Sequence, residues 1–294
     1  MRRLYNIFIY VSLGFVLIYL LWNDYLFIPD IQSPLWLLIS IFFMFGGFLL
    51  NAYAWQFLLK VNNVKISYIE ALASTGLSIF GKYIPGKLWA IVGRAAYITN
   101  NHDQSMLRIS GISLLGQFLA ITTGILLGGQ FFWHYSIKLG FGMFIAAVIL
   151  LLIILSPSTD FILKRSMLYR YKKVRSALQL FGFQLIKVLP WYFLFWLCWG
   201  VGFYALSIAL SGEIEAWSVV PAFILAGSIG IVVFFVPGGI GIREGALFFF
   251  LIKSNLSSEI AATIAVASRL WFLVGESFIF TCGVIANQHL KKRK

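Results

Sequence analysis

The sequence predicts an all-α protein that crosses a membrane several times, with six full spans and two broken helical hairpins. Three observations predict this class. Of the 294 residues, 61% are apolar and only 11% are charged, which is more hydrocarbon than a soluble domain of this size can bury. Several apolar segments have the length of about 20 residues that a crossing helix needs. Two further apolar segments are interrupted by proline and glycine, which break helices.

The six unbroken apolar segments are predicted to be the full spans. They fall at 5–22, 34–59, 107–128, 137–155, 187–210 and 259–287. The first of them follows Arg2 and Arg3 and has the look of a signal peptide. No cleavage site with small residues follows it, so we expect it to be retained as the first helix.

The two broken segments, 68–99 and 217–252, are predicted to enter and leave the membrane on the same side. The breaks contain Pro85 and Gly86 in the first segment and Pro237, Gly238, Gly239 and Gly241 in the second. Because proline lacks an amide donor and glycine adopts angles outside the helical range, each break is expected to divide a helix in two. A divided helix exposes polar backbone groups, which are tolerated only beside protein or a water-filled cavity.

The charge of the connecting segments predicts the orientation. With both broken segments re-entrant and the N-terminus in the cytoplasm, most cations fall on the cytoplasmic side, including those of 156–186 and of the tail 291–294. We therefore expect a multi-pass protein of the cell (inner) membrane with both termini in the cytoplasm. The same bias explains the net charge of +13 without nucleic acid as a partner. The segment 156–186 fits either a basic helix in the membrane interface or an ordinary cytoplasmic loop.

One membrane domain, 1–294, is predicted, and it consists of two halves. The halves 1–130 and 131–294 each contain two full spans, a broken segment and a third full span. The first half starts inside and the second starts outside, so the halves form an inverted repeat. Paired interruptions at corresponding places in such halves point to the substrate site of a transporter.

Cationic residues near the two breaks are the predicted ligands of a lipid headgroup. They are Lys82, Lys87, Arg94, Arg243 and Arg269. Each returning half-helix is expected to begin near mid-membrane and to direct free amides and the positive end of its dipole at an anion such as a lipid phosphate. The alternative is that Lys82 and Lys87 only extend back to the interface from a shallow turn.

Three acidic residues are candidates for ion pairing or proton coupling. They are Glu70, Glu244 and Glu276. Arg269 and Glu276 are seven residues apart and share a helix face. A groove that holds phosphate and a set of structural ion pairs both fit this pattern, because buried pairs are weak evidence for function. No nucleophile with a base and no metal-ligand spacing is found, so no catalytic residue, metal or cofactor is expected, and the chain is not expected to be an enzyme.

Two segments give the chain its likeness to a known family. They read KYIPGKLW at 82–89 and PGGIGIREGA at 237–246. On these segments the chain resembles the lysylphosphatidylglycerol synthase transmembrane-region family, a flippase-like membrane domain. The motif positions that recur here are Lys82, Pro85, Gly86, Lys87, Pro237, Gly238, Gly239, Gly241, Arg243 and Glu244. The resemblance implies movement of lipids between leaflets. Because the sequence ends soon after its last apolar segment, no synthase domain and no aminoacyl transfer are expected.

The leading hypothesis is a translocase that moves an anionic or glycosylated phospholipid, or a polyprenyl-phosphate lipid, between leaflets. The second is a non-transporting scaffold or accessory subunit for enzymes of glycolipid or polysaccharide biosynthesis. Membrane lipids are the expected partners. Glycosyltransferases, lipid-modifying enzymes and a second copy of the chain, as a homo-oligomer, are further candidates.

Overall fold

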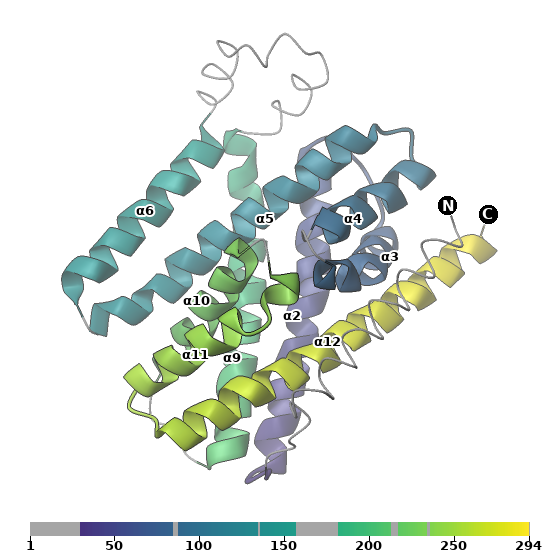
Figure 1. Ribbon diagram of the computed structural model, residues 1–294. Helices are drawn as coiled ribbons and strands as arrows, with labels where there is room; N and C mark the ends of the chain where they lie inside the picture. Colours follow the sequence, from purple (N-terminus) through teal and green to yellow (C-terminus); the bar gives the residue numbers. More distant parts are fainter. Residues whose placement is uncertain are drawn as a thin grey trace.

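The computed structural model describes residues 30–84, 88–134, 136–156, 182–212, 217–233 and 236–293. Within these ranges the chain is helical and contains no strand (Figure 1). Five helices there are long and apolar enough to cross a membrane. The predicted class, an all-α membrane protein with several spans, is therefore confirmed. The predicted span at 5–22 and most of the basic segment 156–186 lie outside the described residues.

The five long helices coincide with the remaining predicted spans. They are α2 (Pro34–Val61), α5 (Met106–Gly128), α6 (Ile137–Leu155), α9 (Leu189–Ser211) and α12 (Ser258–Lys292). Short 3-10 turns extend two of them, η2 (Gly129–His134) after α5 and η4 (Phe183–Val188) before α9. Proline in the first turn of both α2 and α9 suits these helix starts, because the first amides of a helix have no partner within it.

Each broken segment consists of two short helices joined through a turn. The first contains α3 (Tyr68–Ser78), the turn η1 (Ile79–Tyr83) and α4 (Leu88–Asn101), and the second contains α10 (Val219–Val232), the turn η5 (Pro237–Gly239) and α11 (Ile242–Lys253). The longest of these helices has 14 residues, about 21 Å at 1.5 Å per residue, against a hydrocarbon thickness of about 30 Å. The two helices of each pair pack against each other. The second predicted break is present at η5, whereas Pro85 and Gly86 of the first lie outside the described residues. The re-entry of both hairpins into the membrane stays a prediction.

The first hairpin, α3 and α4, opens at the end of the molecule where α2 finishes and α5 begins. His102, just after α4, contacts Glu70 in the first turn of α3, with 2.8 Å between Nε2 and Oε1. At the same end, Arg108 in the first turn of α5 donates a hydrogen bond to the carbonyl of Asn62, which follows α2. The entrance and the exit of the first hairpin are thus held together beside these two helix ends.

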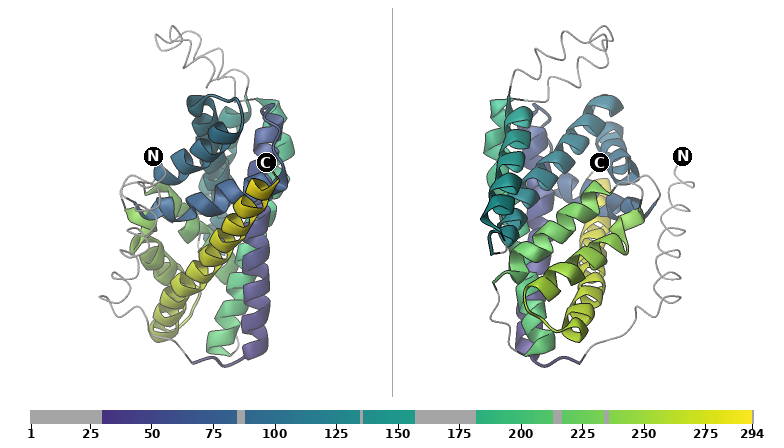
Figure 2. Two further views of the ribbon diagram at one scale, coloured as in Figure 1. Left: turned by 90° about the vertical axis from the view of Figure 1, so that its right-hand side faces the viewer. Right: turned by 60° about the vertical axis from the view of Figure 1, so that its left-hand side comes forward.

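The second hairpin, α10 and α11, opens at the other end of α5. Phe250, near the end of α11, packs on Phe131 of η2 with ring centroids 4.9 Å apart. Trp217, just before α10, stacks on Tyr204 in the last two turns of α9. Since α5 has 23 residues and is about 35 Å long, the hairpins open at opposite ends of the molecule. Figures 1 and 2 show the same relation, with α3 and α4 above α10 and α11.

Helix α12 passes both hairpins, contacting α11, the turn η1 and α3. Its contact with α3 is a backbone contact between two glycines. A Cβ on Gly76 would lie only 2.9 Å from the Cα of Gly283 and would collide with the carbonyl oxygen of Ile279. Small residues at such crossings let helices approach closely, which is a main source of helix association in membranes. This crossing places the middle of α12 beside the turns of both hairpins.

Candidate functional site

The turns of the two hairpins touch each other. Gly238 in η5 has a φ of +60°, and a Cβ at this position would lie 2.5 Å from Cε1 of Tyr83 in η1. Glycine therefore meets two demands here, the left-handed backbone and the close approach of the Tyr83 ring. Arg269 of α12 adds a contact from the side, since its Nη1 donates to the carbonyl oxygen of Gly238 at 3.4 Å. The tips of both hairpins and the middle of α12 thus meet at one place.

Glu276 connects α12 to the first tip. Its carboxylate is 1% exposed and accepts hydrogen bonds from Lys82 Nζ at 2.5 Å and from the Tyr83 hydroxyl at 2.6 Å. Both donors belong to η1. Since a buried carboxylate is costly unless it is paired, these two donors account for its stability in an apolar bundle.

Arg269 connects α12 to the second tip. Its Nη1 lies 3.6 Å from Oε1 of Glu244 in the first turn of α11. The other carboxylate oxygen of Glu244 accepts a hydrogen bond from the amide of Gly241 at 2.7 Å, at the start of the same helix. Glu244 therefore closes the N-terminus of α11 and pairs with α12 at the same time, as an acidic residue at a helix N-terminus can.

Three aromatic rings support the cations, and one of them, Phe223 of α10, lies 5.3 Å from the Arg243 guanidinium. Phe272 of α12 lies under the Lys82 ammonium, 5.4 Å from the ring centroid, and under the Arg243 guanidinium, 4.7 Å from it. The Arg269 guanidinium lies over the Tyr83 ring at 5.1 Å. Cations over ring faces at these distances are stabilised by the ring quadrupole, most strongly where water is excluded. We call Lys82, Tyr83, Arg243, Glu244, Arg269, Phe272 and Glu276 the tip cluster.

The tip cluster is largely closed to solvent and carries an excess of positive charge. Arg243 and Arg269 are each 7% exposed, whereas the Lys82 side chain retains 26% exposure. In their usual ionised forms, its three cations and two carboxylates leave one positive charge. Within the described part of the chain, Nε and Nη2 of Arg243 are buried and have no hydrogen-bond partner. Because buried donors normally find an acceptor, this arginine is the least satisfied member of the cluster.

The structure brings together five of the predicted site residues with a predicted break residue. They are Lys82, Glu244, Arg243, Arg269 and Glu276, with Gly238 between them. Gly239 and Gly241 also adopt positive φ values, +70° and +82°, and Pro237 begins η5. Lys87, Pro85 and Gly86 lie outside the described residues.

Two predicted site residues lie elsewhere. Arg94 of α4 faces α2, where its Nη2 is 3.4 Å from Oδ1 of Asn51 and its guanidinium lies over the Trp55 ring. Glu70 lies at the open end of the first hairpin with Ser67 and His102. Neither contacts the tip cluster through a described hydrogen bond or ion pair, because Arg94 is directed at α2 and Glu70 lies at the opposite end of α3 from η1.

Tyr83 and Phe272 are members of the tip cluster that were not predicted from the sequence. A signal for both is present in the sequence. Tyr83 directly follows Lys82 in the break, and Phe272 lies three residues after Arg269 and four before Glu276, on the same face of α12. An aromatic residue between two ionisable residues on one helix face of a membrane span predicts a ring that packs against the same charged groups.

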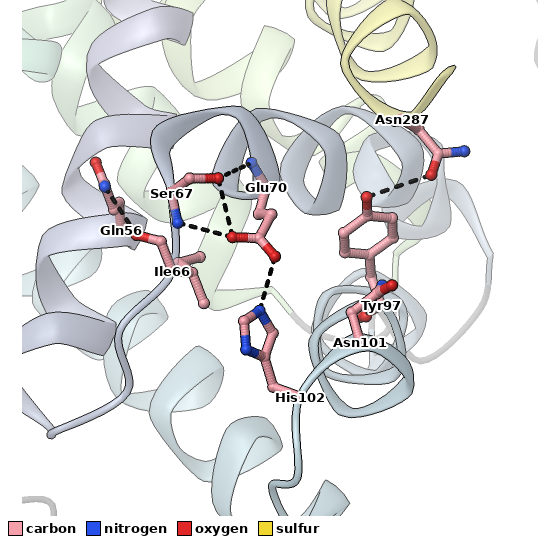
Figure 3. A network of polar contacts seen from close by, with 8 residues as sticks. All are labelled: Gln56, Ile66, Ser67, Glu70, Tyr97, Asn101, His102 and Asn287. Atoms are coloured by element: carbon pink, nitrogen blue, oxygen red, sulfur yellow. Dashed lines mark hydrogen bonds and ion pairs between the residues drawn. The ribbon is translucent and has the colours of Figure 1, made fainter. Parts of the chain in front are cut away.

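Glu70 connects the start of α3 to His102, just after α4, at the open end of the first hairpin (Figure 3). Its carboxylate accepts from the amide of Ser67 at 2.8 Å and contacts His102, while its own amide donates to the Ser67 hydroxyl. This is a capping box, which closes the start of α3. A second link joins the Tyr97 hydroxyl of α4 to Asn287 of α12 at 3.3 Å. Burial raises the pKa of Glu70, but the hydrogen bonds from Ser67 and the contact with His102 outweigh it and hold this pKa below its ordinary value of 4.5.

Replacing Glu70 with glutamine is expected to lower the thermal midpoint of unfolding at pH 7. A carboxylate whose pKa is lowered by folding stabilises the fold fully above its unfolded pKa, and this stabilisation is lost as the pH falls through the folded pKa. The difference between the wild type and Glu70→Gln should therefore be greatest above about pH 4.5 and shrink below it. Thermal unfolding in detergent between pH 3.5 and 8 measures this. Glu259→Gln, at an exposed glutamate of α12, is the control, and an equal profile for both variants would contradict the assignment.

Comparison with known families identifies the chain. The family model described as the lysylphosphatidylglycerol synthase TM region matches residues 7–275. The chain belongs to this family. The predicted membership is thus confirmed, and the protein is a multi-pass membrane domain of a lipid-related kind. Comparison with curated proteins and with solved structures found no match.

The match to the lysylphosphatidylglycerol synthase TM region covers both hairpins and nearly all of the tip cluster. The cluster residues from Lys82 to Phe272 lie within the matched range, and Glu276 follows directly after its last residue. Membership therefore extends over the part of the chain in which the two tips meet.

Proposed function

We propose that this protein moves an anionic lipid between the leaflets of the inner membrane, with the headgroup passing through the tip cluster. The observation that carries the proposal is the meeting of two hairpin tips, open at opposite ends of the molecule, on one buried cationic cluster. Ionisable residues inside a membrane protein are costly and normally mark a substrate or ion pathway. Membership in the lysylphosphatidylglycerol synthase TM region family supports a lipid as the substrate.

The ion pairs of the tip cluster suggest how an anion is accommodated. Without a substrate, Glu276 neutralises Lys82 and Glu244 neutralises Arg269. An incoming phosphate competes with these carboxylates for the same cations, and its negative charge offsets the one positive charge that the tip cluster carries in excess, which is costly in a dry site. The acyl or isoprenoid tails stay in the bilayer throughout. The chain acts in this proposal as a transporter rather than an enzyme.

The proposed orientation follows from the same geometry. Re-entrance of both hairpins from opposite faces makes the two halves an inverted repeat, which is an arrangement of transporters with a central site. The basic residues of 156–186 and of the C-terminal tail then lie in the cytoplasm. Protease protection or cysteine labelling of both termini in inside-out and right-side-out vesicles tests this orientation.

Leaflet exchange by the purified protein tests the proposal. Proteoliposomes of phosphatidylcholine that contain fluorescently labelled phosphatidylglycerol are quenched from outside, and the rate at which inner-leaflet label becomes accessible is measured. We expect faster exchange than in protein-free vesicles. Arg243→Ala should slow the exchange about tenfold or more, the effect of losing hydrogen bonds from a charged group.

Lys253→Ala is the control, because Lys253 is an exposed cation at the other end of the same helix. It should exchange lipid at the wild-type rate. If the folded wild-type protein gives no more exchange than empty vesicles, the translocase proposal is wrong. A role as a scaffold for glycosyltransferases or lipid-modifying enzymes would then be favoured.

A further inference from the structure

The three acidic residues predicted for ion pairing or proton coupling differ in what holds their carboxylates. Glu70 is bonded at the open end of the first hairpin, and one oxygen of Glu244 accepts from an amide at the start of its own helix. Glu276 lies on α12, but both of its described hydrogen bonds come from Lys82 and Tyr83, neighbouring residues of η1. Glu276 is therefore the acid whose described partners leave together when η1 moves away from α12.

Passage of a headgroup between the two ends of the molecule requires such a movement. A Cβ on Gly238 would lie 2.5 Å from Cε1 of Tyr83, so the two tips are in contact. In the proposed function the headgroup passes between the tips, and this contact has to open. Lys82 and Tyr83 belong to the tip that moves, whereas Glu276 belongs to a continuous helix of 35 residues. Opening of the first tip thus takes both hydrogen-bond donors away from Glu276.

The other charged side chains around α12 have different contacts. Arg269, two turns before Glu276, pairs with α11, and Arg243 of α11 lies over two aromatic rings, its charge being offset by the lipid phosphate in the proposed function. Helices α2, α3 and α9 also pack on α12. Helix α9 contains no charged residue, and Lys60 of α2 and Glu70 of α3 have their contacts at the open end of the first hairpin.

The remaining surroundings of Glu276 are apolar. Leu273 and Phe280, one turn before and one turn after it, pack on the aromatic cluster that includes Phe80 of the first tip. Gly275 of α12 lies against a buried phenylalanine of α2. An ionised carboxylate without partners in such surroundings is strongly unfavourable, and the group takes up a proton instead.

We propose that Glu276 is the proton site of the translocase, ionised while the first tip is docked on α12 and protonated while the tip is withdrawn. This deepens the proposed function and rests on it. On opening, a proton from water binds a carboxylate oxygen of Glu276. On docking, the O–H bond breaks, the proton returns to water and the Lys82 ammonium takes its place. The withdrawn state binds one proton more, so acid favours it, by up to about tenfold in the opening equilibrium per pH unit.

Hydrogen–deuterium exchange of the first tip measures this opening directly. The full chain in nanodiscs is exchanged between about pH 5.5 and 8.5, and the protection of residues 79–83 is corrected for the intrinsic exchange rate at each pH. A peptide of α6 is the internal reference. Protection of 79–83 should fall about tenfold or more from the alkaline to the acidic end, while that of α6 stays constant. Constant protection of 79–83 would overturn the proposal, because the carboxylate would then find water or Arg243 in place of a proton.

Glu276→Gln imitates the protonated state. Glutamine keeps the shape of the side chain but carries no charge, so protection of the first tip should equal the low wild-type value in acid at every pH. Glu244→Gln is the matched control, because it removes the other carboxylate of the tip cluster, and the pH dependence should persist in it. A pH dependence that persists in Glu276→Gln, or one that is lost in Glu244→Gln, would contradict the assignment.

Tyr83→Phe keeps the test decisive if Glu276→Gln does not fold. This variant removes one of the two hydrogen bonds to Glu276 and leaves the ion pair with Lys82 in place. Protection of the first tip should be about tenfold or more lower at every pH, the effect of losing a hydrogen bond to a charged group, and its pH dependence should remain. A protection curve equal to that of the wild type would show that these contacts do not hold the tip.

Proton binding and leaflet exchange fail separately. The exchange assay with labelled phosphatidylglycerol, repeated over the same pH range with equal pH on both sides, should become faster in acid for the wild type. Protection that depends on pH through Glu276, without leaflet exchange, would support the proton site and refute the translocase. Leaflet exchange with protection that is independent of pH would leave the translocase in place and refute the proton site.

Discussion

Replacing Glu276 with leucine is expected to destabilise the protein by about 3–5 kcal/mol, the cost of leaving a buried charge without its partner. The carboxylate is 1% exposed and is the hydrogen-bond acceptor of both Lys82 and Tyr83. Its removal leaves an ammonium and a hydroxyl without an acceptor beside Phe272. The measurement is the free energy of unfolding in mixed micelles titrated with sodium dodecyl sulfate and followed by tryptophan fluorescence.

The double variant Lys82→Leu with Glu276→Leu should recover most of the lost stability. When both members of a buried ion pair become apolar, the desolvation cost of the two charges disappears, and such replacements are often neutral or stabilising. The recovered protein should nevertheless have lost lipid exchange, because the cluster no longer contains these two charges. Glu259→Leu, at an exposed glutamate of α12, serves as the control and should change stability little. A double variant as unstable as Glu276→Leu would show that the pairing is not the reason for the loss.

Replacing Gly76 with alanine is expected to destabilise the protein by about 3 kcal/mol, the upper part of the usual range for overpacking. The new Cβ would collide with the carbonyl oxygen of Ile279 and lie 2.9 Å from the Cα of Gly283. Both neighbours are backbone atoms, so relief requires α3 and α12 to move apart. The same titration with sodium dodecyl sulfate measures the loss.

Gly46→Ala is the matched control for Gly76→Ala. Gly46 also lies inside a helix, but a Cβ there meets no atom within 4 Å. Alanine should therefore stabilise α2 by up to about 1 kcal/mol through its better helix propensity. The two glycine-to-alanine changes are thus expected to have opposite signs. A similar effect of both would indicate that the crossing of α3 and α12 is looser than the structure has it.

The described long helices could be predicted from the sequence because an apolar run of sufficient length has few alternatives to a span. The exact ends of these helices are harder to predict from the sequence. The predicted span 187–210 begins in the structure with the 3-10 turn η4 at Phe183, and the first α-helical turn starts next to Pro190. The first break also differs in detail. Helix α3 ends at Ser78, well before Pro85. At this helix end, the Ser78 hydroxyl donates to the carbonyls of Ser74 and Thr75.

The candidate site could be predicted in part, because breaks and the charges next to them are visible in sequence. Lys82 and Arg243 were found in this way, and Glu276 followed from its spacing to Arg269. Spacing does not reveal which neighbouring helix a side chain faces. For this reason Arg94, which contacts α2, could not be separated from the cluster. The contact between the two tips, with Tyr83 against Gly238, depends on tertiary packing and has no local signal.

Helix α12 holds one hairpin through Glu276 and the other through Arg269, two turns apart on the same side of a continuous rod. A small sliding or rotation of this rod changes both contacts together, as in a shear motion between packed helices. Whatever loosens one contact therefore alters the free energy of the other, and this linkage is reciprocal. In the proposed translocase, one helix would then coordinate opening towards one leaflet with closing towards the other, without a chain of intermediate residues between two separate gates.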